Sequence, residues 1–192
     1  MTSLETVGER KIIELILEQL EKMPCMSVSF GDDVAAYPIN DDQLLILKTD
    51  MLVGKTDIPH GMSLWQAARK AVVMNVSDFA AKGVKPKVML VSLGLPRKLA
   101  KKDAVKDIGR GLNAGAREYG AYIVGGDTNE ASDIIISLSL FGIAKKDSLM
   151  LRSGAKTRDI VAVTGFFGKT ASGLKILLNN LEAPQKFCKI LV

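Results

Sequence analysis

Four aspartates stand in short polar or glycine-containing stretches whose chemistry fits a shared site. Asp33 follows Gly31 at the start of an expected strand, and Asp50 lies near the end of a second expected strand. Asp78 lies on an expected helix, and Asp127 follows two glycines. Magnesium takes oxygen ligands and is usually shared between one or two carboxylates and substrate phosphates. The four aspartates therefore predict a divalent-cation site that handles a phosphorylated ligand.

Each of these aspartates also has a simpler structural explanation. Asp32 and Asp33 could form a turn or a salt bridge with a nearby lysine, while Asp41 and Asp42 are typical turn residues. Four carboxylates brought together repel one another unless cations neutralise them. The metal interpretation therefore requires the fold to gather the four aspartates in one pocket.

Glycine-rich stretches offer further contacts to phosphate. Gly126, after another glycine and before Asp127, could present backbone N–H groups to phosphate oxygens or form only a tight turn. Arg152 could form paired hydrogen bonds with a phosphate or lie on the surface. The sequence at 168–170 is not a Walker A motif, because Val163 stands where that motif needs glycine. Phosphate binding, if present, does not use a P-loop.

The elements that must position these residues follow from the apolar spacing. An amphipathic helix is expected over 2–22, with capping-box spacing between Thr2 and Glu5. Two strands should flank a turn at 40–42, so that Asp33 and Asp50 return to the same end. Further elements are expected as a helix over 63–82, a strand over 87–95, a helix over 103–119 and strands over 121–124 and 134–144. This order predicts an α+β fold, a mostly antiparallel sheet with helices on one face.

Two of the expected helices carry informative residues. Ser63 is the expected N-cap of the first, Gly83 its stop, and Asn75 and Asp78 share a face of it. Burying Asp78 unpaired would be costly, which favours a cation partner. In the second helix, three glycines weaken the helical propensity and predict a close approach to the sheet: Gly109, Gly111 and Gly115.

The chain changes character after residue 146. A polar connector over 147–159 precedes an expected strand over 160–164 and an expected helix over 170–180. One strand and one helix cannot bury two faces alone. The sequence therefore predicts an N-terminal domain over 1–146 and the start of an incomplete C-terminal domain over 147–192.

Composition narrows the class of protein. With 47% hydrophobic and 24% charged residues, the chain is typical of a globular protein. A net charge of +5 could attract phosphates. Aromatic residues make up only 5% of the chain, however, and no basic stretch contains aromatic residues, so nucleic-acid binding is not expected. No membrane segment is expected, and the two cysteines show no metal-ligand spacing, which favours a reducing cytoplasm. A single histidine, His60, disfavours a histidine-ligated zinc enzyme.

Five motifs in order resemble those of thiamine-monophosphate kinases, within the aminoimidazole-ribonucleotide-synthetase-like superfamily. They lie at 31–33, 48–50, 75–83, 125–128 and 152–155. The resemblance implies ATP-dependent phosphorylation of thiamine monophosphate to thiamine diphosphate, with Mg²⁺ as cofactor and ATP as co-substrate. It implies metal ligands at Asp33, Thr49, Asp50, Asp78 and Asp127. It also implies ATP contacts at Gly126, Asp127 and Arg152, and a homodimer formed through the N-terminal sheet. No catalytic residue is assigned.

Two departures from the family pattern and two alternatives stay open. Lys48 stands where the family often has a hydroxyl residue, and 54–57 replaces a histidine-containing sequence. The chain alone is expected to be inactive, because the resemblance implies further residues in a second domain. The alternatives are another ATP-using member of the superfamily, such as an aminoimidazole ribonucleotide synthetase or a hydrogenase-maturation protein, and a non-catalytic dimerising module that binds nucleotide.

Overall fold

The structure is a computed structural model that describes residues 7–179 and 181–182. Its α-helices are α1 (Glu9–Leu17), α2 (Gly54–Asp57), α3 (Leu64–Ala81), α4 (Lys102–Glu118) and α5 (Lys169–Leu178). Its strands are β1 (Ala35–Pro38), β2 (Gln43–Val53), β3 (Pro86–Leu95), β4 (Tyr122–Glu130) and β5 (Ile135–Lys145). Short 3-10 helices, η2 (Arg97–Leu99) and η3 (Lys146–Ser148), follow β3 and β5.

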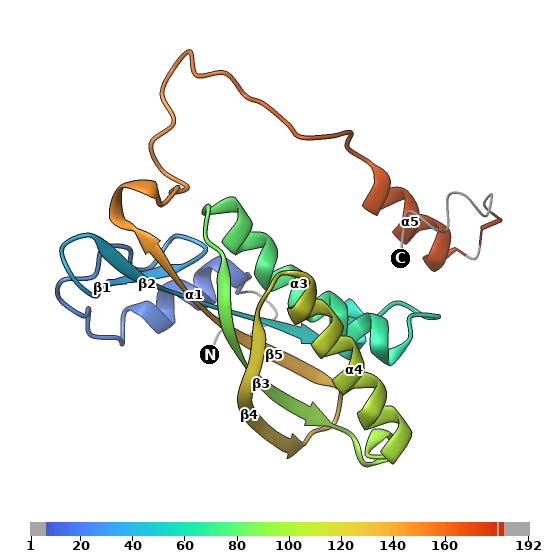
Figure 1. The fold of residues 1–192 in the computed structure, drawn as a ribbon. Helices are drawn as coiled ribbons and strands as arrows, with labels where there is room; N and C mark the ends of the chain where they lie inside the picture. Colours follow the sequence, from blue (N-terminus) through green and yellow to red (C-terminus); the bar gives the residue numbers. More distant parts are fainter. Residues whose placement is uncertain (1–6, 180, 183–192) are drawn as a thin grey trace.

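The five strands form one sheet in the order β1-β2-β5-β3-β4 (Figure 1). Only β3 and β4 run parallel, and α4 connects them, while the other three neighbouring pairs are antiparallel. A parallel pair needs such a crossover, whereas antiparallel neighbours can follow short turns. The α+β class with a mostly antiparallel sheet is therefore confirmed.

The β1–β2 hairpin forms at the turn that the sequence predicts. The side-chain oxygen of Asn40 accepts hydrogen bonds from the backbone N–H groups of Asp42 and Gln43, at 3.0 and 2.9 Å. Asparagine is favoured in turns because its side chain can bond its own backbone in this way. The register pairs Ala35 with Leu47, so the segment before β1 returns beside the middle of β2.

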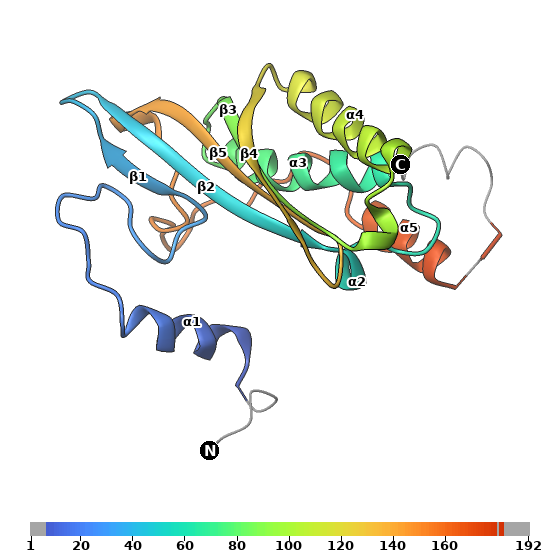
Figure 2. The same cartoon turned by 90° about the horizontal axis from the view of Figure 1, so that it is seen from below.

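Helices α3 and α4 cover one face of the sheet, and no described helix covers the other (Figure 2). Ser63 and Gln66 form a capping box at the start of α3, which satisfies backbone donors that a helix N-terminus leaves free. Gly83 ends the helix in a left-handed conformation, with φ at +72°. Both expected ends of α3 are thus present.

Glycines in α4 serve a contact with α3 rather than with the sheet. A Cβ on Gly111 would collide with the backbone oxygen of Trp65, and one on Gly115 would lie 2.9 Å from Val72 Cβ. Gly109 has open space around its Cβ position. The expected close approach therefore exists, but the partner expected from the sequence was wrong, because α3 and α4 pack side by side on the same face (Figure 2).

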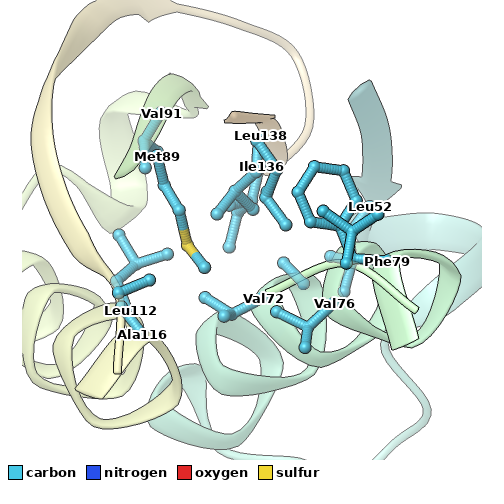
Figure 3. Packing of buried hydrophobic residues seen from close by; sticks show 14 of the residues in the cluster. Leu52, Val72, Val76, Phe79, Met89, Val91, Leu112, Ala116, Ile136 and Leu138 are labelled. Carbon is cyan, nitrogen blue, oxygen red and sulfur yellow. The ribbon is translucent and has the colours of Figure 1, made fainter. Parts of the chain in front are cut away.

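The hydrophobic core lies between the sheet and the two helices (Figure 3). Leu52 of β2, Met89 of β3 and Leu138 of β5 point toward Val72 and Phe79 of α3. All five side chains are at most 1% exposed. Alternate positions of each strand supply these residues, as expected for a sheet with one buried face.

The first helix is shorter than predicted and stands apart from the core (Figure 2). It covers Glu9–Leu17 and has no buried residue. The predicted capping residues Thr2 and Glu5 lie outside the described residues. An isolated helix of this length has little stability of its own, which fits an early end well before Pro24.

The segment after η3 contains the predicted helix but not the predicted strand. Helix α5 agrees with the expected helix over 170–180, whereas 160–164 is irregular. Ile160 and Val161 are more than nine-tenths exposed. A strand needs a neighbour for its backbone hydrogen bonds, and no described strand pairs with 160–164. The division into domains at residue 146 stays a prediction.

Candidate functional site

Lys48 lies between two of the predicted metal ligands. Its ammonium nitrogen is 2.6 Å from Oδ2 of Asp78 and 3.9 Å from Oδ2 of Asp50. Positions 48 and 50 continue the face of β2 on which Ile46 and Leu52 are buried, because side chains two apart on a strand point the same way. The Lys48 side chain is 13% exposed, and those of the two carboxylates are 31–38% exposed. The strand and α3 thus bring Asp50 and Asp78 to one cation.

A second lysine holds the segment before β1. Lys82 Nζ lies 2.5 Å from Oδ1 of Asp32 and 3.1 Å from Oδ2 of Asp33. The backbone N–H of Arg152 donates to Oδ2 of Asp32 at 2.9 Å, and its guanidinium lies 3.3 Å from Oδ1 of Asp33. Lys82 is only 3% exposed. This cluster joins three distant parts of the chain and agrees with the simpler explanation of Asp32 and Asp33 as salt-bridge partners.

The pKa values in this second cluster reflect strong pairing. Burial alone would raise the pKa of Asp32, but hydrogen bonds from Arg152, Lys82 and Asp33 outweigh it and hold that pKa below its ordinary value. Burial alone would lower the pKa of Lys82, but the Asp32 and Asp33 carboxylates outweigh it and raise that pKa. Both groups are therefore charged at neutral pH.

Helix α3 connects the two clusters. Asp78 and Lys82 are four residues apart and so lie on one side of the helix, about one turn from each other. Asp33, Asp50 and Asp78, three of the five predicted metal ligands, therefore lie along the α3–β2 side of the domain. No described group of three or more His, Cys, Asp or Glu residues is arranged to hold a metal ion; the carboxylates are instead paired with lysines.

Thr49 and Asp127 are placed differently, so the structure does not gather the four aspartates in the one pocket that was expected from the sequence. The Thr49 hydroxyl donates to the Leu138 carbonyl at 3.0 Å and lies 3.4 Å from the Ser139 hydroxyl. Its side chain therefore points away from that of Asp50, as neighbours on a strand do. Asp127 lies on β4, at the opposite edge of the sheet from β1. Since β5 and β3 separate β4 from β2, Asp127 is about 14 Å from β2 by the usual strand spacing.

Asp50 lies near the end of β2, which stops at Val53 as expected. Asp127 was expected just after a strand but lies within one, because β4 continues to Glu130, well past the expected end at residue 124. Gly126 pairs with Val91 of β3, and a Cβ at this position would collide with the Val91 carbonyl oxygen. The missing side chain thus lets two strands approach, and the tight-turn explanation was wrong.

The donor chemistry of Asp50 and Asp78 fits a cation. Their carboxylate oxygens are the ligands that magnesium prefers. The Lys48 ammonium between them is a positive charge that both already share. Each carboxylate is also partly exposed, so a ligand can reach it from solvent. These residues can bind a cation together with an anionic ligand.

Sequence reasoning missed the role of Lys82 and part of the role of Asn75. Lys82 could have been found from its spacing, because it follows Asp78 by one helical turn. Asn75 is 1% exposed and donates to the Ala71 carbonyl at 3.0 Å, while its side-chain oxygen has no partner among the described residues. Its burial had a signal in the sequence, because Asn75 follows Ala71 by four residues and Val72 by three and so shares their apolar helix face.

A comparison with protein families identifies the class of this domain. Residues 31–144 match the model of the AIR synthase related protein family, N-terminal domain. The match includes α3, α4 and the whole sheet except Lys145, the last residue of β5. The chain belongs to this family.

The relatives are more specific than the family. The chain is 41% identical over 178 residues to the thiamine-monophosphate kinase of Pyrococcus horikoshii, covering 93% of this chain and 55% of that protein. The resemblance seen in the sequence motifs is therefore confirmed. The chain spans about half the length of the curated relatives it matches.

Solved structures agree with this comparison. The structure described as AaThiL complexed with AMPPCP and TMP is similar with a TM-score of 0.86 and 30% identity, over 99% of this chain and 59% of that one. A thiamine monophosphate kinase from Aquifex aeolicus is similar with a TM-score of 0.80 and 31% identity, over 96% and 58% of the two chains. Among the helices that the structure describes, none combines the length and the apolar character needed to cross a membrane.

Proposed function

We propose that this chain acts in the ATP-dependent phosphorylation of thiamine monophosphate to thiamine diphosphate. The observation that carries the proposal is the similarity, over nearly the whole chain, to a structure described as complexed with AMPPCP and TMP. AMPPCP is an ATP analogue, so that protein binds a nucleotide and a phosphorylated ligand together. The pairing of Asp50 and Asp78 around a cation is the feature of this chain that supports the same chemistry.

The proposed metal ligands are those that the resemblance implies: Asp33, Thr49, Asp50, Asp78 and Asp127. When bound, magnesium would neutralise the phosphate oxygens and help orient the transferred group. Asp50 and Asp78 fit this role most directly, because they are partly exposed and share a cation. Thr49 and Asp127 lie apart from that pair, so their assignment is supported by the resemblance alone.

The proposed ATP contacts are Gly126, Asp127 and Arg152. Arg152 is 65% exposed and has its guanidinium near Asp33, so it can turn toward a phosphate without leaving a buried partner. Gly126 and Asp127 line a shallow pocket beside Leu112 of α4. Phosphoryl transfer depends chiefly on positioning and charge neutralisation; here Arg152 would supply positive charge, Gly126 backbone groups and Asp127 a carboxylate for a metal ion.

Calorimetry with AMPPCP and Mg²⁺ tests the metal part of this proposal. In the unchanged chain, Mg²⁺ should tighten nucleotide binding by about tenfold or more, because the ion links carboxylates to phosphates. Asp78→Asn should remove this dependence. The matched control is Asp103→Asn, an exposed acid on α4, which should leave it unchanged. Full magnesium dependence in Asp78→Asn would count against the assigned ligands.

A screen of phosphate acceptors tests the substrate. Because the chain spans about half the length of its relatives, the screen belongs on the longest natural chain that contains this sequence, and the 192-residue chain alone is proposed to be inactive. Phosphorylation of thiamine monophosphate in preference to other acceptors is the expected result. Transfer to a different acceptor would favour another ATP-using member of the superfamily. Nucleotide binding without any transfer would favour the non-catalytic module.

The open face of the sheet supports a homodimer. Four large apolar side chains on it are 39–53% exposed: Tyr37, Met51, Leu90 and Ile143. Exposed apolar patches of this kind are typical of interaction surfaces. The resemblance implies that a second copy of the chain covers this sheet, and we propose the same arrangement here.

Sedimentation velocity tests the dimer. Met51→Lys places a charge on the open face and should weaken self-association by about tenfold or more, since an interface core excludes unpaired charge. Val105→Lys changes an exposed apolar residue of α4 and is the control. A purely monomeric chain, or equal effects of the two substitutions, would contradict the proposal.

The cytoplasmic location predicted from the sequence remains a prediction.

A further inference from the structure

One residue of the site has no role in the proposed function. Lys48 is a lysine beside two of the proposed magnesium ligands, Asp50 and Asp78, where an additional positive charge is unexpected. Its ammonium lies 2.6 Å from Asp78 and 3.9 Å from Asp50. The ammonium already supplies positive charge to both carboxylates, which is what a divalent ion would otherwise supply there.

We propose that Lys48 is the resident cation of the Asp50–Asp78 pair and takes the place of one divalent ion there. The proposal rests on the proposed function for the assignment of these two aspartates as metal ligands, and it changes the number of ions the site holds. Its basis is geometric: one side chain, fixed by the fold, already contacts both carboxylates.

Burial makes this arrangement persistent. The Lys48 side chain is 13% exposed, so it lies deeper than the carboxylates it pairs with. An ammonium in this position has lost most of its contact with water, and the two carboxylates supply the opposite charge that compensates for this loss.

Charge explains why a divalent ion should not join Lys48 between the carboxylates. The two carboxylates carry two negative charges, and Lys48 neutralises one of them. A divalent ion inserted beside the ammonium would meet a like charge at contact distance. Any magnesium ion brought by a nucleotide should therefore bind on the outer side of the pair, where the phosphates supply further oxygen ligands.

Titration of the 192-residue chain with Mn²⁺ alone, followed by electron paramagnetic resonance, tests this inference. Manganese takes the same oxygen ligands as magnesium. Lys48→Met should gain about one bound Mn²⁺ per chain relative to the unchanged protein, because the two carboxylates then lack a cation. Lys48→Met combined with Asp78→Asn should lose that gain. Lys106→Met removes a positive charge from an exposed position on α4 and should gain nothing.

Three results would overturn the inference. Lys48→Met could bind no more Mn²⁺ than the unchanged chain, the gain could survive Asp78→Asn, or the unchanged chain could already hold an ion that Asp78→Asn removes. If Lys48→Met does not fold, nuclear magnetic resonance of the unchanged chain tests the inference instead. With equimolar Mn²⁺, backbone amide signals of 48–50 should keep their intensity, and their selective loss would contradict the inference.

The manganese readout is independent of kinase activity. It uses neither nucleotide nor thiamine monophosphate, so it can succeed where the acceptor screen fails. A gain of one ion in Lys48→Met with no transfer to thiamine monophosphate would remove the proposed function and leave the role of Lys48 intact. Phosphoryl transfer to thiamine monophosphate, without a gain of Mn²⁺ in Lys48→Met, would support the proposed function and overturn the role of Lys48.

Discussion

Two lysines of this domain each pair with two aspartates, and they differ in burial. Lys82 is 3% exposed, and one of its partners, Asp32, is 10% exposed. Lys48 is 13% exposed, and its partners Asp50 and Asp78 are about one-third exposed. In the first group, Lys82 and Asp32 are buried and only Asp33, at 32%, is open to solvent, whereas both carboxylates of the second group are open to solvent.

The difference in burial separates a structural role from a ligand-binding role. Lys82 ties the end of α3 to the segment before β1 and, through Asp32, to the backbone of Arg152. A ligand cannot reach Lys82 or Asp32 without unfolding part of the domain, whereas Asp33 at the edge of this group is 32% exposed. Lys48 has similar chemistry, but both of its carboxylate partners are accessible. Asp33, Asp50 and Asp78 can therefore exchange their pairing for a cation or an anionic ligand, and Asp32 cannot.

Removing the buried lysine should have the largest effect on stability. Lys82→Met leaves two carboxylates without their buried partner, and breaking a buried pair in this way costs about 3–5 kcal/mol. Lys48→Met is the matched control, with an expected loss of about 1 kcal/mol or less because its partners can be solvated. Urea unfolding of both variants, without metal, measures the difference. Equal losses would show that burial does not distinguish the two groups.

The stability of the Lys82 group should depend on pH in a defined direction. The pKa of Asp32 is lowered from 3.8, so its stabilisation is complete above that value and is lost as the pH falls through the lowered folded-state pKa. The pKa of Lys82 is raised from 10.5, so its stabilisation is complete below that value and is lost as the pH rises through the raised folded-state pKa. The difference in unfolding free energy between the unchanged chain and Lys82→Met should therefore be constant between these limits and shrink in acid. A difference that grows in acid would contradict this assignment.

The smallest effect on stability is expected from the Arg152 side chain, at the exposed edge of the Lys82 group. The Arg152 side chain is 65% exposed and touches only the Asp33 carboxylate, while its backbone N–H makes the bond to Asp32. Arg152→Ala keeps the backbone bond and should change the unfolding free energy by about 1 kcal/mol or less. The same urea unfolding experiment measures it. A loss as large as that of Lys82→Met would place the guanidinium among the structural groups.

Most elements of the sheet domain could be predicted from the sequence. The turn at Asn40, the N-cap at Ser63 and the stop at Gly83 are local signals, because each depends on the residue's own side chain or backbone conformation. The alternating apolar pattern over 134–144 predicted a strand with one buried face, and β5 covers this segment. These predictions are confirmed to within a few residues by the element bounds.

The errors lie where the partner of a segment decides the outcome. The length of β4 depends on pairing with β3, so its continuation to Glu130 had no local signal. The glycines at 111 and 115 indicated a close approach, but whether a helix or a sheet approaches depends on which face each element covers. The strand expected over 160–164 has a favourable composition and no described partner strand.

The sequence by itself determined the residue types of the site and the family, because motifs are read from the order of residues. It placed carboxylates, a lysine and glycines in motifs that resemble those of one family. Only the tertiary structure decided which charges meet: it joined Asp50 and Asp78 through Lys48, closed Asp32 and Asp33 around Lys82, and left Asp127 three strands away. The physical reason is that ionic contacts depend on distance in space, and strand order, which fixes those distances, is set by pairing between segments far apart in the chain.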